Sequence, residues 1–158
     1  MSDEPNFSEI VIPERVRVLD KVNSRAAVLR TAGKLLADSP QELNSHEVIG
    51  ALLKREQEGS TALDSSGVAV PHCRLNGCTT PIGCLFRMSH PVKFAGESVD
   101  LVFALVTSNE SQREHLKILQ ACAKMFLNEH NLEELRQSED DLSLHSSFQK
   151  LMNQTLAK

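Results

Sequence analysis

The run from Val99 to Val106 is almost continuously apolar, and it restricts the possible folds more than any other stretch. A strand with one face in water alternates apolar and polar residues, whereas a continuous apolar run is typical of a strand that is covered on both faces. We therefore predict that this segment is the central strand of a sheet.

Capping residues and apolar spacing predict four helices. The first begins after Ser24 and runs to about Ala37, and the second begins after Asn44 and ends at Gly59. A helix after Ser111 and one after Ser138 follow. The spacing Asn44 to Glu47 and Ser111 to Glu114 is that of a capping box. The sides expected to face the core are Leu116, Leu119, Ala123 and Phe126 in the third helix and Leu144, Phe148, Leu151 and Met152 in the fourth.

Three further strands are predicted, at 15–19, 68–70 and 81–88. Proline has no N–H to donate to a sheet, so we expect Pro71 to end the second of them. The pair His90-Pro91 is expected in a loop, and residues 132–135 in a short turn. Residues 1–13 are expected to form a loosely held terminus.

The 158 residues suffice for one domain with a substantial core, so we predict a single domain over 1–158. The net charge of −4 gives no positive field, which argues against a nucleic-acid partner. The sequence contains no apolar run long enough to span a bilayer and no leader-like start. These features predict a cytoplasmic protein that is not embedded in a membrane.

Four cysteines, at positions 73, 78, 84 and 122, show no Cys-x-x-Cys spacing. A chain of this size does not need disulfide bonds, and free thiols are the expectation. A zinc site built from His72, Cys73 and Cys78 remains an alternative, although the sequence shows no metal-ligand cluster.

The most informative motif is Gly-Val-Ala-Val-Pro-His at 67–72. An imidazole fixed at the rigid end of a strand is well placed to act as a nucleophile or a ligand, although a histidine can also simply end a strand. Upstream, Arg55 falls in the last turn of a predicted helix, where a cation also interacts favourably with the helix dipole. Downstream, His115 falls in the first turn of another, where unpaired N–H groups favour an anion.

This order of residues resembles the phosphorylation-site region of the IIA components of the bacterial phosphotransferase system, of the fructose/mannitol type. The resemblance rests on Arg55-Glu56, Gly59-Ser60-Thr61, the motif ending at His72, and His115-Leu116-Lys117-Ile118-Leu119, and it extends over most of the chain. It implies an α/β fold in which a mixed β-sheet is flanked by helices on both faces, a three-layer sandwich. Two departures are Cys73, where glycine is usual, and Asp64-Ser65-Ser66, where a glycine-richer loop is expected.

The resemblance also implies an activity, that of a phosphotransferase component which carries phosphate on a histidine. His72 would accept a phosphoryl group from an HPr-like phosphocarrier protein. Arg55, His115, Ser60 and Thr61 would support the phosphoryl oxygens, with no metal and no organic cofactor. Phosphohistidine transfer requires a neutral ring nitrogen near neutral pH, and positioning and electrostatics supply most of the catalysis.

Within the family, the segment Arg-Glu-x-x-Gly-Ser-Thr looks more like the nitrogen-regulatory IIA proteins, whose binding to regulatory protein targets depends on phosphorylation. The alternative is a sugar-transport IIA component that passes phosphate to a IIB domain of a sugar permease. Two alternatives of another class are a non-catalytic binding module and a metal-binding protein.

Overall fold

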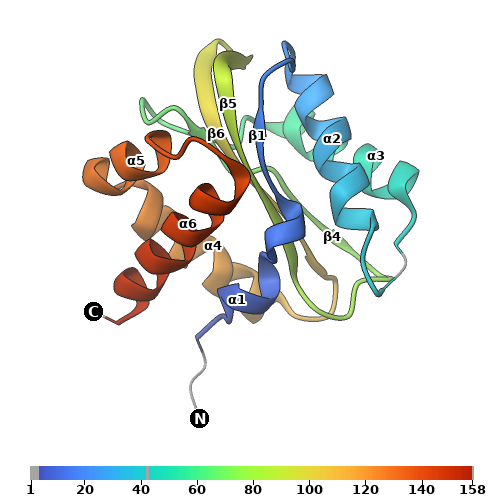
Figure 1. Cartoon of the computed structure of the whole chain (residues 1–158). Coiled ribbons are helices and arrows are strands. Elements are labelled where there is room, and N and C mark those ends of the chain that lie inside the picture. Colours follow the sequence, from blue (N-terminus) through green and yellow to red (C-terminus); the bar gives the residue numbers. More distant parts are fainter. Residues whose placement is uncertain (1–3, 42, 158) are drawn as a thin grey trace.

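The computed structural model describes residues 4–41 and 43–157. The described residues form a six-stranded mixed sheet with helices on both faces (Figure 1), as the family resemblance implied. The sheet order is β1-β5-β6-β3-β2, and β4 also pairs with β6. The strands are β1 (Val16–Leu19), β2 (Ala62–Leu63), β3 (Val68–Ala69), β4 (His72–Leu75), β5 (Ile82–Phe94) and β6 (Glu97–Ser108).

The strand β6 is central and buried on both faces, which confirms the prediction from its apolar run. It pairs antiparallel with β5 and parallel with β3 and β4. Its side chains alternate between two core clusters, because successive residues of a strand point to opposite faces. Phe103 and Leu105 lie in one cluster, and Ala104 and Val106 lie in the other.

Two groups of helices cover the sheet (Figure 1). One face carries α2 (Arg25–Ala37) and α3 (Ser45–Glu58). The other carries α4 (Gln112–Phe126), α5 (Glu129–Arg136) and α6 (Asp141–Leu156), together with the short α1 (Phe7–Ile10). A 3₁₀ turn, Pro13–Arg15, leads into β1. No helix within the described ranges is both long and apolar enough to cross a membrane.

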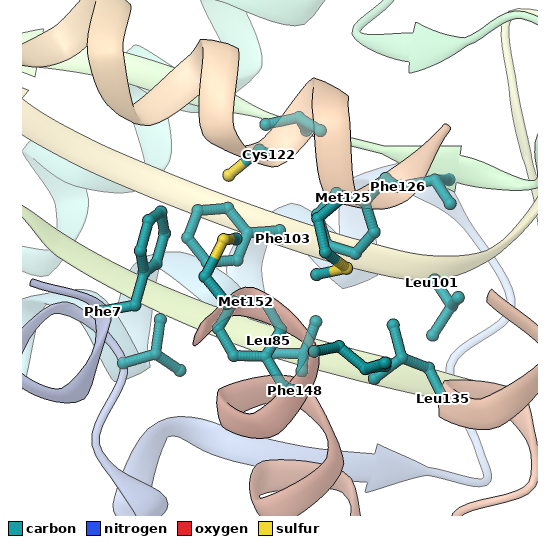
Figure 2. Close-up of a cluster of buried hydrophobic side chains, with 14 of the residues drawn as sticks. Phe7, Leu85, Leu101, Phe103, Cys122, Met125, Phe126, Leu135, Phe148 and Met152 are labelled. Carbon is teal, nitrogen blue, oxygen red and sulfur yellow. The ribbon is translucent and has the colours of Figure 1, made fainter. Parts of the chain in front are cut away.

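An aromatic cluster fills the core beneath α4 and α6 (Figure 2). Phe103 from β6 stacks on Phe148 from α6, with ring centroids 5.7 Å apart. Phe7 from α1 contacts both rings. Phe7, Ile10 and Val11 are all buried, so the expected loose terminus is wrong for residues 7–13. Residues 1–3 of that expectation lie outside the described residues.

The helix boundaries follow the predicted caps at two of the four positions. Ser24 accepts a hydrogen bond from the Ala27 N–H, and Asn44 accepts one from the Glu47 N–H. Ser111 makes no side-chain cap bond at the start of α4, so the capping box predicted there is wrong.

The start of α6 and the segment before it also differ from the prediction. Asp140 rather than Ser138 caps α6, because the Asp140 carboxylate accepts from the Ser143 N–H while the Ser143 hydroxyl bonds back to Asp140. The predicted turn at 132–135 belongs to α5.

The inner face of α4 agrees with the prediction at Phe126, which is buried, and at Leu119, which is partly buried against the core, but it differs in the first turn. His115, Ile118, Cys122 and Met125 are buried, whereas Leu116 is 47% exposed. The apolar pattern predicted Leu116 inside and gave no reason for a buried His115. The structure reverses this because His115 has a buried polar partner, described below.

Two prolines lie at interruptions of the sheet pairing. β3 ends at Ala69, just before Pro71, as predicted, but the chain resumes as β4 at His72 and pairs with β6 again, and the Pro71 carbonyl accepts from the Leu105 N–H. His90-Pro91 lies inside β5, at an irregularity where the pairing with β6 shifts register, and not in a loop. In both places the missing proline N–H is tolerated because the ladder is interrupted there.

Arg136, the last residue of α5, holds the segment that leads to the motif. Arg136 makes a bidentate ion pair with Asp100, and its Nη2 also donates to the Ser66 carbonyl at 2.7 Å. Gly67, with φ +80°, packs against this guanidinium. A Cβ added at Gly67 would lie 2.5 Å from the Arg136 Nη2.

We therefore expect Gly67→Ala to lower the free energy of unfolding by about 2–4 kcal/mol, through left-handed strain and loss of charged hydrogen bonds. Gly96→Ala is the matched control, because Gly96 also has positive φ but has nothing within 4 Å of an added Cβ. It should cost about 1 kcal/mol. Urea unfolding measures both, and equal losses would show that the Arg136 contact contributes nothing.

Candidate active site

His72 is the first residue of β4 and is partly buried, and its Nδ1 lies 2.7 Å from the Val70 carbonyl oxygen. A carbonyl oxygen only accepts, so the proton of this hydrogen bond belongs to Nδ1. The neutral ring therefore has its free lone pair on Nε2. The backbone around Pro71 thus fixes both the place of the imidazole and its nucleophilic atom.

The electrostatic surroundings favour the neutral form of this ring. Burial lowers the pKa of His72, and the hydrogen bond to Val70 opposes part of that effect. The positive charge of Arg55 lowers the pKa further, whereas the carboxylate of Glu56 raises it. A lowered pKa leaves the imidazole unprotonated near neutral pH, which is the state that a nucleophile requires.

His115 lies beside His72. The two ring centroids are 5.3 Å apart, and the planes are inclined by 52°. His115 lies in the first turn of α4 and is 6% exposed. Its Nδ1 is 2.6 Å from the hydroxyl oxygen of Thr107, which lies on β6. Burial, followed by the nearby His72 and Arg74, lowers the pKa of His115 to about 4.

The lowered pKa of His115 predicts a pH-dependent stability. An unfolded chain binds a proton at this residue below its ordinary pKa of 6.5, whereas the native state binds it only near pH 4. Stability therefore rises with pH across that window, and this contribution is lost as the pH falls from 6.5 toward 4. Between pH 7 and pH 5 we expect the free energy of unfolding to fall by about 2 kcal/mol from this residue.

Urea unfolding of the unaltered protein and of His115→Gln at both pH values measures this contribution. The variant should show the smaller pH dependence. His130→Gln, which changes an exposed histidine on α5, is the control and should retain the full dependence. An unchanged slope in His115→Gln would contradict the assignment.

Arg55 is in the last turn of α3, and its Nη1 donates to the Gly59 carbonyl at 2.8 Å. The helix ends at Gly59, so the turn that follows also fixes the guanidinium. The positive charge of Arg55 is near enough to His72 to contribute to the lowering of its pKa.

The two hydroxyl groups that were predicted to contact the phosphoryl oxygens differ in whether their proton is already used in a hydrogen bond. Thr61 is buried, and its hydroxyl donates to the Glu56 carboxylate at 2.7 Å, so this proton is not available to a phosphoryl group. Ser60 is exposed, and its oxygen accepts from the Ala62 N–H at 3.1 Å. The Ser60 hydroxyl proton is not used in that bond.

Sequence reasoning assigned no role to two charged residues near the pair of histidines. Glu56 is 3% exposed and accepts from both the N–H and the hydroxyl of Thr61, which closes the turn after α3. Arg74 lies two residues after His72 on the same face of β4, and its charge lowers the pKa of His115. The sequence signal for Arg74 was its spacing of two residues from His72, because residues i and i+2 of a strand lie on the same face.

The described residues do not support the alternative zinc site. No group of three or more His, Cys, Asp or Glu in ranges 4–41 and 43–157 is arranged to hold a metal ion. Cys73 follows His72 in β4, so its side chain points to the opposite face and lies in the core against α2 and α3. Burial raises the pKa of the Cys73 thiol to about 12, as expected for an inert core cysteine.

Comparisons with known proteins show the family of the chain. Residues 9–150 match the family model described as "Phosphoenolpyruvate-dependent sugar phosphotransferase system, EIIA 2". A nitrogen regulatory protein of Pseudomonas aeruginosa is 34% identical over 123 residues, which cover 76% of this chain and 79% of that protein. A mannitol-specific phosphotransferase enzyme IIA component of Staphylococcus aureus is 27% identical over 147 residues, 91% of this chain and 98% of that protein.

A solved structure is similar in both fold and sequence. The crystal structure of the nitrogen regulatory protein IIA-Ntr from Neisseria meningitidis superposes with a TM-score of 0.80 at 32% identity, and the match covers 89% of this chain and 97% of the other. With the family model matched over most of its length, the chain belongs to the EIIA 2 family of the phosphoenolpyruvate-dependent sugar phosphotransferase system.

Proposed function

We propose that this chain, acting as a single cytoplasmic domain, is a phosphohistidine carrier that accepts a phosphoryl group on Nε2 of His72 from an HPr-like phosphocarrier. The observation that carries the proposal is the hydrogen bond from Nδ1 to the Val70 carbonyl, because it leaves the lone pair on Nε2. Membership of the EIIA 2 family and the partial exposure of His72, which a second protein can reach, support it.

In the transfer step the Nε2 lone pair of His72 forms a bond to phosphorus while the bond between phosphorus and the donor's histidine nitrogen breaks. The electron pair of the broken bond returns to the donor imidazole. The Nδ1 proton stays on His72, and the Val70 carbonyl that accepts it stabilises the positive charge that the ring gains. No metal or organic cofactor takes part in this scheme.

The remaining site residues would act on the phosphoryl oxygens. Arg55 would supply a permanent positive charge and two N–H groups in fork geometry. His115 would supply one N–H donor from its neutral ring. Ser60 would add a weaker hydroxyl contact, since its proton is not used in its bond with Ala62. Such charge stabilisation is the main catalytic term in phosphoryl transfer.

We assign the chain to the nitrogen-regulatory branch, in which phosphorylation changes binding to regulatory protein targets. The similarity to the Pseudomonas aeruginosa and Neisseria meningitidis proteins supports this assignment. The second candidate is a sugar-transport IIA component that passes phosphate to a IIB domain, which the similarity to the mannitol-specific component supports.

The test of the carrier function is direct labelling. The chain is mixed with an HPr-like protein that carries ³²P on its histidine, and the labelled products are separated. We expect phosphate on this chain that is lost in acid and stable in base, and a ³¹P spectrum of an Nε2-linked phosphohistidine. No transfer from the donor would refute the proposal, and an Nδ1 linkage would refute the assigned atom.

A chase separates the two branches. The phosphorylated chain is incubated with a IIB domain of the fructose/mannitol type, and phosphate on the IIB cysteine is measured. A regulatory protein should keep its label, whereas a sugar-transport component should lose it within one encounter. Rapid and complete transfer to IIB would favour the second candidate.

A further inference from the structure

Thr107 is a buried residue of β6. It lies outside the motif at 67–72 and is not one of the charged residues near the two histidines. It has no exposed surface, and its neighbour in β4 by register is Arg74. The side chain makes one hydrogen bond within the described ranges, the 2.6 Å contact between Oγ1 and Nδ1 of His115. A threonine hydroxyl inside a buried strand therefore faces a functional ring and little else that is polar.

The position of the proton in this hydrogen bond can be inferred from the polar groups around it. If the Nδ1–H of His115 donated to the hydroxyl, the hydroxyl proton would need another acceptor. The Thr107 side chain makes no other hydrogen bond within the described residues, and at 0% exposure it is closed to bulk solvent. A buried donor without an acceptor is costly, so the hydroxyl donates to Nδ1 instead. The proton of the neutral His115 ring is then on Nε2.

The two neighbouring histidines thus have opposite tautomers. The Val70 carbonyl, an obligate acceptor, holds the proton of His72 on Nδ1. The Thr107 hydroxyl holds the proton of His115 on Nε2. Nε2 of His72 is the lone-pair atom, and Nε2 of the ring 5.3 Å away is the donor atom. We propose that Thr107 is a positioning residue, which fixes the Nε2–H tautomer of His115 so that this N–H donates to the phosphoryl group on His72.

The inference rests on the proposed function, and it adds the reason why His115 donates. With its low pKa, His115 is neutral near pH 7 and has a single N–H. A neutral imidazole with an unconstrained Nδ1 would spend part of its time as the other tautomer, which presents a lone pair to the anion. Two lone pairs facing each other repel, so the fixed tautomer decides whether His115 helps or hinders transfer.

The experiment compares Thr107→Val, which has nearly the same shape but no hydroxyl, with Thr107→Ser, which keeps it. Thr155→Val is the matched control: Thr155 is also a buried threonine, but its hydroxyl donates to the Leu151 carbonyl within α6. The first measurement is the tautomer of His115 in ¹⁵N-histidine-labelled, unphosphorylated protein at pH 7. We expect Nε2–H in the unaltered protein, Thr107→Ser and Thr155→Val, and a mixture of tautomers in Thr107→Val.

The second measurement is single-turnover transfer from the phosphorylated donor. Thr107→Val should be about tenfold slower, the effect of one weakened hydrogen bond, while Thr107→Ser recovers most of the rate. An Nδ1–H tautomer in the unaltered protein would overturn the proposal, and so would an unchanged tautomer and rate in Thr107→Val. The tautomer is read without a donor, so a chain that takes up no phosphate refutes the carrier function separately from this assignment.

Discussion

His72→Ala is expected to abolish phosphate uptake completely while the fold stays intact. Alanine has no nucleophilic atom, and no neighbouring group replaces the lone pair on Nε2 of His72. His115 cannot substitute for it, because it is buried and its Nδ1 is bonded to Thr107. The measurement is transfer of ³²P from the phosphorylated donor, with circular dichroism and urea unfolding to check the fold.

His130→Ala is the matched control for this variant. His130 lies exposed on α5, so its loss removes an imidazole of the same kind without touching the site. It should be labelled at the rate of the unaltered protein. Full labelling of His72→Ala would show that a different residue of the chain is phosphorylated.

The second large effect is expected from Arg55, whose alanine variant should still accept phosphate at His72 but far more slowly. Arg55 stabilises charge on the phosphoryl oxygens and does not form the bond, so its removal slows the reaction without preventing it. Loss of one such contact costs about 2–4 kcal/mol, or roughly a hundred- to a thousandfold in rate. His115→Ala should also slow the transfer, because it loses a neutral donor.

Arg55→Lys separates charge from geometry. A lysine retains the positive charge but lacks the planar fork, so the variant should recover only part of the rate. It also loses the guanidinium bond to the Gly59 carbonyl that holds the side chain in place. Arg30→Ala, a change of an exposed arginine on α2, is the control. If both Arg55 variants transfer phosphate at the single-turnover rate of Arg30→Ala, Arg55 takes no part in the transfer and is only a cation at the end of a helix.

The core of the fold was predictable from local patterns. The apolar run at 99–106 predicted a strand that is covered on both faces, and β6 has alternate side chains in two core clusters. The helix after Ser24 begins and ends within a residue of its predicted limits. Both signals are local: burial on two faces demands apolar side chains throughout, and a cap acts within one helical turn.

Errors arose where a distant partner overrode the local rule. β3 ends before Pro71 as predicted, but the second strand beyond Pro71 was not predicted, because it forms on the free length of β6. Leu116 was expected to face the core, but it is exposed and His115 is buried instead, because the Thr107 hydroxyl satisfies the imidazole inside the protein. Phe7 and Val11 reach the core because α6 and β6 offer an apolar surface that a reading of the terminus alone cannot reveal.

The candidate site divides in the same way. The candidate residues could be predicted without the structure, because Arg55, the motif ending at His72 and His115 occur in an order that resembles the family. The geometry of the candidate site, in contrast, follows only from the folded chain. Residues 72 and 115 are 43 positions apart, yet the sheet and α4 bring their rings together. The proton on each ring is placed by Val70 and Thr107, because a tautomer depends on the atom facing each nitrogen, and only the folded chain determines which atom that is.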